Sequence, residues 1–280
     1  IHNYIEGDEL YFFGFSRGAY TVRSTAGMIR KVGLLDKVEA DRAMEAWRIY
    51  REHAGGPDSQ RAIAFREAFS RYPVRIRFLG VWDTVGALGI PGALSFIGRR
   101  RFQFHDVSLS RSVDYAYQAL AIDERRRFFR PAVWKQHPEA RGQVLEQAWF
   151  PGAHMDVGGG HRDHRLADAA LIWIADGARA AGLALNDAYM EQIADADPLG
   201  RIHESRKSFY RLIPAYDRPI GTGGDDEPDE AVRSNERLHS AAEKRYELDS
   251  RYRPRGLVDY LARLGKRLAG GPGGGEPGGD

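Results

Sequence analysis

The chain has 280 residues, of which 42% are hydrophobic and 29% charged, the composition of an ordinary globular protein. Its formal net charge of +2 is too small to indicate a nucleic-acid partner, and the absence of cysteine excludes disulfides, zinc–thiolate sites and cysteine nucleophiles. The longest apolar runs, such as ALIWIA at 170–175, are far shorter than a membrane span, and no signal-peptide pattern opens the chain.

The chain is expected to begin with a strand that leads into a helix. Residues 9–14 are short, aromatic and bounded by charge and glycine, which is typical of a buried strand. The following helix is expected over 19–32, where Gly33 can serve as its C-terminal cap.

Two further helices are expected next. Asp36 and Glu39 have the spacing of a capping box, and the apolar residues after them recur at helical spacing as far as Ala54. Ser59 can cap another helix, which ends near Arg71.

The middle of the chain continues the alternation of strands and helices. In chain order, the expected elements are a strand at 74–82, a helix within 106–130 marked by Leu109, Val113, Ala116 and Leu120, a strand at 145–150 and a helix at 166–182.

Strands separated by long helical stretches predict an α/β fold with a mostly parallel sheet. The helical stretches 36–71 and 106–130 would be insertions over one edge of that sheet. We expect one catalytic domain over 1–269 and a disordered Gly/Pro-rich tail at 270–280. Because the chain starts at Ile1 with a strand close behind, we expect a fragment that lacks N-terminal strands.

The junction between the 9–14 strand and the following helix carries the motif Gly14-Phe15-Ser16-Arg17-Gly18, which fits G-x-S-x-G. A nucleophile elbow needs small residues on both sides of the serine because the turn is tight, and it needs a strand before and a helix after. Both conditions are met, so Ser16 is the predicted nucleophile. The alternative is a structural turn that requires small residues.

A serine nucleophile needs a histidine base that a carboxylate orients. Asp83 directly follows the strand at 74–82, and His154 lies in a glycine-rich loop after the strand at 145–150. We predict Asp83 as the acid and His154 as the base, in the chain order Ser, Asp, His. The alternatives are a helix-cap aspartate, a structural loop histidine, and Asp156 as the acid.

Alternating histidine and aspartate in the same loop would also suit zinc or a harder cation. The residues of this cluster are His154, Asp156, His161, Asp163 and His164. The intervening glycines leave the ligand geometry loose, so no metal and no cofactor are expected.

Three sequence blocks resemble one family. They are GFSRGAYTVRSTAGMIRKVGLL, GVWDTVGALG and WFPGAHMDVGGGH, and weaker similarity continues to about residue 257. The chain resembles the α/β-hydrolase family that includes the first class of type VI secretion lipase effectors. The resemblance implies a serine esterase of phospholipase A type, with Ser16, Asp83 and His154 as its triad. It also implies export by a type VI secretion system, with an adaptor or immunity protein as partner.

The start of the chain departs from this family, whose members begin with further strands and an Asp-Gly-Thr segment near the active site. The backbone N–H of Arg17 can supply one oxyanion-hole donor, and a loop before the nucleophile strand normally supplies the second. We therefore expect weak turnover from this chain and an unpaired edge on the 9–14 strand.

An apolar segment at 85–98 follows the predicted acid, and three arginines at 99–101 follow that segment. It could form a lid in which Leu88 and Ile90 contact an acyl chain, while Arg99 and Arg100 bind a phosphate headgroup at a membrane surface. The alternatives are a buried loop, an esterase for small soluble substrates, and a non-catalytic interaction module.

Overall fold

The computed structural model describes residues 1–52, 56–85, 109–137, 139–223 and 235–269, with side chains as far as residue 265. The Gly/Pro-rich segment 270–280 lies outside the described residues.

The described strands form one five-stranded sheet and one small two-stranded sheet. All neighbours in the large sheet run parallel, in the order β1-β4-β5-β6-β7. Its strands are β1 (Leu10–Phe15), β4 (Ile76–Trp82), β5 (Val113–Ala121), β6 (Val144–Phe150) and β7 (Glu236–Leu238). The small antiparallel sheet pairs β2 (Leu34–Leu35) with β3 (Ser70–Arg71). These strands confirm the predicted α/β class, and β1 forms one edge of the large sheet.

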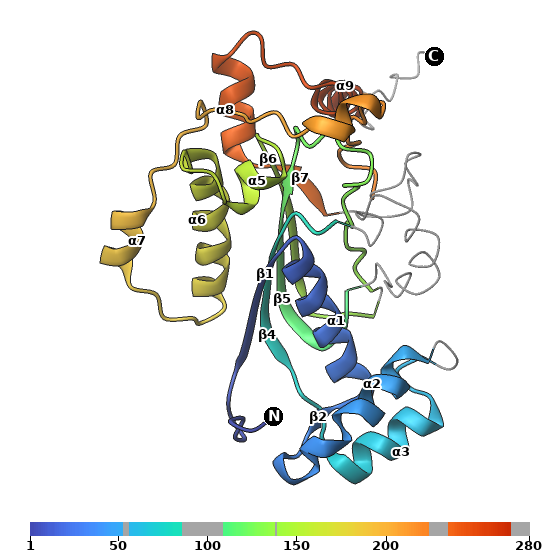
Figure 1. Ribbon diagram of the computed structural model, residues 1–280. Helices are drawn as coiled ribbons and strands as arrows, with labels where there is room; N and C mark the ends of the chain where they lie inside the picture. Colours follow the sequence, from blue (N-terminus) through green and yellow to red (C-terminus); the bar gives the residue numbers. More distant parts are fainter. Residues whose placement is uncertain (53–55, 86–108, 138, 224–234, 270–280) are drawn as a thin grey trace, which may run out of the picture.

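Two long helices cover the two faces of the large sheet (Figure 1). Helix α1 (Arg17–Val32) buries Ala19, Ala26 and Ile29 against apolar residues of β4 and β5. Helix α6 (Arg165–Ala180) buries Ala170, Ile174 and Ala178 on the other face. Both faces of the central strands are therefore apolar, as in other parallel sheets.

Most of the remaining helices lie near the two ends of the strands, whereas α7 lies on the outer side of α6 (Figure 1). The 3₁₀ helix η1 (Lys37–Arg42), α2 (Ala43–Arg51) and α3 (Gln60–Phe69) precede β3, and α2 and α3 form a separate apolar cluster with the end of α1. After β6 come α5 (His154–Gly158), α6, α7 (Asp187–Ile193) and the 3₁₀ helix η2 (Ser208–Leu212). Helices α8 (Ser240–Leu248) and α9 (Arg255–Ala269) follow β7. Among the described residues, no helix combines the length and apolarity that crossing a membrane requires.

The structure corrects two local predictions. The helix expected within 106–130 is wrong, because its described part contains the strand β5. Both faces of β5 are buried, so its apolar residues do not alternate, and Val113, Ala116 and Leu120 match helical spacing by coincidence. The Asp36 capping box is also wrong, since the Asp36 side chain caps nothing and instead accepts a hydrogen bond from Arg71 Nε at 2.9 Å.

Other boundaries agree with the sequence. Gly33 follows α1 with φ 74°, and the Ser59 side chain accepts a hydrogen bond from the Ala62 N–H at the start of α3. Because the strands are parallel, their carboxyl ends share one edge, where side chains from distant parts of the chain can meet.

Candidate active site

Ser16 occupies a sharp turn between β1 and α1. Its φ of 54° and ψ of −113° lie in a region that non-glycine residues rarely adopt. The Ser16 N–H donates to the carbonyl of Trp82 at 3.0 Å, which fixes the turn beside the end of β4. The serine is half-buried, and Arg17 behind it is the first residue of α1. The first N–H groups of a helix have no acceptor within the helix, so the Arg17 N–H is available as a donor.

The two glycines that flank the turn differ. A Cβ on Gly14 would lie 2.5 Å from the backbone oxygen of Gly18, so only glycine fits at position 14. A Cβ on Gly18 would meet no atom within 4 Å. The described residues therefore explain Gly14 by close packing but give no steric reason for Gly18.

Asp83 and His154 meet at the carboxyl edge of the sheet. Nδ1 of His154 lies 2.6 Å from Oδ2 of Asp83, and both side chains are buried. Asp83 follows β4 with a φ of 41°, where its N–H donates to the Ala119 carbonyl at 2.8 Å. Its Oδ1 accepts the N–H of Ala121 at 3.0 Å. The carboxylate is thus held by the neighbouring strand β5 and directed at the imidazole.

A buried arginine completes the surroundings of Asp83. Arg218 donates to both carboxylate oxygens, from Nη1 to Oδ1 at 2.6 Å and from Nη2 to Oδ2 at 3.0 Å. It also donates to the carbonyls of Ala121 and Phe129, which anchor the guanidinium. Burial alone would raise the pKa of Asp83, but the Arg218 charge, together with His154, holds that pKa well below its ordinary value. Asp83 is therefore ionised at neutral pH.

The imidazole of His154 lies between two aromatic rings. Its centroid is 4.6 Å from that of Phe15 and 5.2 Å from that of Phe129. Phe15 immediately precedes Ser16 and packs closely on α5, where a Cβ on Gly158 would fall 2.0 Å from its ring. These contacts bring His154 beside the Ser16 turn. An imidazole that a buried carboxylate orients can accept a proton from a nearby hydroxyl.

The other members of the predicted His/Asp cluster separate into different pairs. His164 Nδ1 lies 2.6 Å from Asp168 Oδ2, and both oxygens of Asp163 accept from Arg165. Asp156 is bonded to His203 instead of His154. The five-residue metal cluster considered from the sequence therefore does not form as such.

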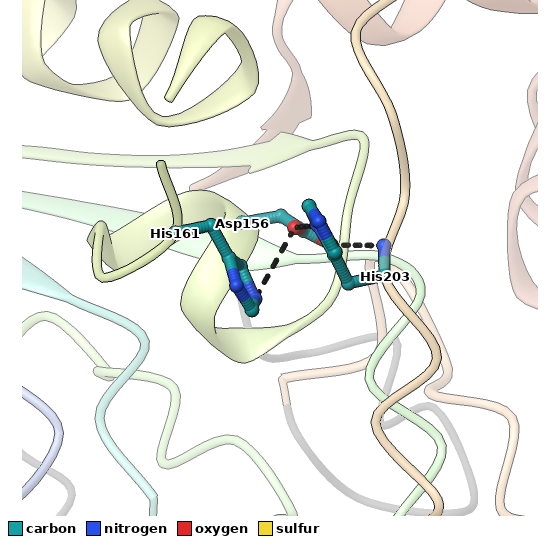
Figure 2. A group of neighbouring side chains, drawn as sticks. All are labelled: Asp156, His161 and His203. Atoms are coloured by element: carbon teal, nitrogen blue, oxygen red, sulfur yellow. Dashed lines mark hydrogen bonds and ion pairs between the residues drawn. The ribbon is translucent and has the colours of Figure 1, made fainter. Parts of the chain in front are cut away.

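Asp156 forms a second compact group with His161 and His203 (Figure 2). Oδ1 of Asp156 lies 2.6 Å from Nδ1 of His203 and 3.7 Å from Nε2 of His161. The two imidazoles stack with centroids 3.8 Å apart and planes 16° apart. Among the described residues, these three side chains are the group whose ligand atoms lie close enough to hold a metal ion.

Sequence reasoning missed Arg218, His203 and Glu124. Glu124 is buried, accepts from Arg126 and Ser205, and accepts from the N–H of His154 at 3.4 Å, so it ties segment 201–207 to the site. No local pattern marks Arg218, whose neighbours DRPIG are typical of a loop. The predicted lid at 85–98 and the contact residues Leu88, Ile90, Arg99 and Arg100 lie outside the described residues, apart from Val85.

The parallel sheet and the Asp–His pair at its carboxyl edge define an α/β protein with a candidate active site at that edge. Within this class, the chain belongs to the family described as T6SS, Phospholipase effector Tle1-like, catalytic domain, whose model matches residues 1–177. This finding confirms the resemblance seen in the three sequence blocks. Arg218 and His203 lie beyond the matched residues.

Two relatives illustrate the similarity. The chain is 36% identical over 140 residues to the uncharacterized protein YEL023C of Saccharomyces cerevisiae, covering 47% of this chain and 19% of that protein. A solved structure, the Tle1 effector bound to the VgrG spike from the Type 6 secretion system, is 26% identical with a TM-score of 0.27. That match covers 55% of this chain and 25% of the solved chain. The chain thus spans a quarter or less of the length of either relative.

Proposed function

We propose that this chain is a serine carboxyl-ester hydrolase in which Ser16 is the nucleophile, His154 the general base and Asp83 the orienting acid. The observation that carries the proposal is the 2.6 Å contact between Asp83 and His154 beside the strained Ser16 turn. Backbone strain of about 1–3 kcal/mol persists only where the surroundings enforce it, and such strain concentrates at functional sites.

The proposed reaction has two halves. Ser16 Oγ attacks the ester carbonyl carbon while its proton passes to Nε2 of His154, and the Arg17 N–H donates to the developing oxyanion. The tetrahedral intermediate then expels the alcohol, which takes the proton from His154, and leaves an acyl group on Ser16. Water, deprotonated by His154, hydrolyses this acyl-enzyme. Asp83 stays ionised throughout and stabilises the imidazolium that forms in each half.

We propose a phospholipid as the substrate, on the basis of the family to which the chain belongs. Segment 85–98 is the candidate acyl-contacting region, and Arg99 and Arg100 are the candidate headgroup ligands. An esterase for small soluble substrates is the second candidate.

A series of esters of increasing chain length separates the two candidates, because only a lipolytic enzyme gains turnover with long, aggregated substrates. Leu88→Asp should then reduce turnover of long-chain lipid more than turnover of a short ester, whereas equal losses would contradict the lid.

The family also suggests how the protein is delivered. We propose export by a type VI secretion system, with a component of that system as partner, by analogy with the Tle1 effector that was solved bound to VgrG. Co-purification of the whole protein with a VgrG spike protein would test this.

The decisive experiment is labelling with a fluorophosphonate probe, which reacts with activated serines. The wild-type chain should be labelled and Ser16→Ala should not, while Ser240→Ala, at an exposed position on α8, serves as the matched control. Loss of a triad nucleophile typically costs about 10⁶ in kcat. A folded wild-type chain that shows neither labelling nor ester hydrolysis would overturn the proposal in favour of a non-catalytic interaction module.

A further inference from the structure

The group formed by Asp156, His161 and His203 has no role in the proposed ester hydrolysis. Its three side chains come from different segments: α5, the glycine-rich loop after α5, and the segment 201–207 (Figure 2). One ligand atom of each lies within 4.8 Å of the other two. We propose that these residues form a binding site for a divalent transition-metal ion, with Zn²⁺ as the best match.

The donor set fits this class of ion. Two imidazole nitrogens and one carboxylate oxygen are ligands that zinc accepts, with bonds of about 2.0–2.2 Å, and water supplies the fourth position in open sites. Imidazole favours zinc, copper, iron or nickel, whereas calcium and magnesium prefer sites made of oxygen ligands alone.

The distances are near those of a zinc site, but the two imidazoles must turn to bind one ion, because stacked rings with planes 16° apart cannot both direct an in-plane nitrogen lone pair at it. Ligand atoms around a tetrahedral zinc ion lie roughly 3.3 Å apart when the bonds are about 2.0–2.1 Å. The separations from Asp156 Oδ1 are 2.6 Å to His203 Nδ1 and 3.7 Å to His161 Nε2, which lie on either side of that value. An ion that replaces the proton between Asp156 and His203 would open the shorter distance and close the longer one.

The carboxylate is already oriented for this task. Oδ2 of Asp156 accepts the backbone N–H groups of Ala153 at 2.9 Å and His203 at 3.0 Å, which leaves Oδ1 to face both imidazoles. Such outer hydrogen bonds fix the direction of a metal ligand. Gly160, with φ 117°, turns the chain so that His161 returns over α5, and a Cβ there would lie 2.7 Å from Met155.

The surrounding charge is mixed but includes a second carboxylate. Asp123 lies within electrostatic range of Asp156, and Lys207 is the cationic neighbour of His161. A bound ion would join three segments around the helix that carries His154. Its main effect would therefore be to stabilise this side of the candidate active site without taking part in the reaction.

The test measures zinc binding by the full 280-residue chain, purified without a histidine tag, dialysed against a chelator and titrated by calorimetry. We expect one Zn²⁺ per chain, a rise in Tm on addition of zinc, and visible absorption bands of a four-coordinate ion when Co²⁺ replaces zinc. His161→Ala should weaken zinc binding by at least about a hundredfold, beyond the ten- to hundredfold typical of losing an outer partner.

His161→Ala is the primary variant because the His161 side chain is 25% exposed and its loss should spare the fold. His203→Ala and the double variant extend the test. His164→Ala is the matched control, since it removes a histidine that Asp168 binds elsewhere. Ser16→Ala and His154→Ala should bind zinc like the wild type, so the outcome does not depend on the proposed hydrolase. Unchanged binding in the double variant, or no binding at millimolar zinc, would overturn the metal site.

Discussion

Among the described residues, two Asp–His pairs include a residue of α5 and share a 2.6 Å contact to Nδ1, yet their surroundings differ. In the pair Asp83–His154, a buried arginine binds the carboxylate and the imidazole packs beside the Ser16 turn. In the pair Asp156–His203, backbone N–H groups hold the carboxylate and a second imidazole stacks on the first. A short Asp–His distance by itself therefore does not indicate which pair is catalytic. The two pairs differ in what lies next to each imidazole. His154 lies beside the Ser16 turn, whereas His203 stacks on His161.

The largest predicted difference comes from removing each histidine. His154→Ala should lower kcat by about 10⁶, as much as Ser16→Ala, because base and nucleophile act as one unit. His203→Ala, His161→Ala and His164→Ala should each retain most of the activity. Turnover of one short ester by the four variants, compared with the wild type, checks this. Equal losses for His154→Ala and His203→Ala would contradict the distinction between the two pairs.

Replacing the two aspartates should also lower kcat unequally, by a smaller factor than replacing the histidines. The larger loss is expected at Asp83 and the smaller at Asp156. Asp83→Asn should lower kcat by about 10⁴, since an amide favours the wrong imidazole tautomer while leaving the geometry intact. Asp156→Asn should mainly weaken zinc binding. Parallel measurements of kcat and zinc affinity on both variants test the separation. If Asp156→Asn gave the larger loss of kcat, Asp156 would be the acid.

Arg218 is predicted to be a positioning residue that acts through Asp83. Arg218→Gln leaves a buried carboxylate without its cation, which destabilises a protein by about 3–5 kcal/mol. A misplacement of the acid should also lower kcat, by about 10². The pKa of Asp83 is lowered in the folded protein, so its ionised form contributes stability at neutral pH that is lost as the pH falls.

Without Arg218 the Asp83–His154 pair should take up a proton more easily, and the acid limb of the pH–rate profile should move to higher pH. Arg218→Lys should recover part of both effects. Arg237→Gln is the control, because its ion pair with Glu146 lies at the surface. A loss of stability with no shift in the pH profile would indicate a purely structural role for Arg218.

The smallest predicted effect concerns the two glycines of the Ser16 turn. Gly14→Ala forces a methyl group against the Gly18 carbonyl and should cost about 1–3 kcal/mol of stability as well as activity. Gly18→Ala meets open space and should be tolerated. Thermal unfolding and probe labelling of both variants provide the measurement. A strong defect in Gly18→Ala would mean that substrate or another part of the protein approaches Gly18 closely.

The sequence predicted most of the strands and helices that position the site. The strand at 9–14, the helix after it, the strands at 74–82 and 145–150 and the helix at 166–182 all correspond to observed elements. These predictions are correct because the apolar residues of each segment match its buried positions. Glycines or polar residues also mark where each segment begins and ends. The apolar spacing in β5 predicts a helix instead of a strand, because a strand buried on both faces has no alternation to mark it.

By itself the sequence determined the α/β class, the family blocks and the positions of Ser16, Asp83 and His154 at the carboxyl ends of three predicted strands. Only the tertiary structure decided which aspartate meets which histidine. Asp156 is two residues from His154, but α5 directs its carboxylate toward His203, while Asp83 reaches His154 across 71 positions of sequence. It also decided that Arg218, 135 positions from Asp83, neutralises the buried carboxylate. The physical reason is that a buried charge is stable only beside an opposite charge or hydrogen-bond partners. A local sequence pattern does not show which distant segment supplies that partner.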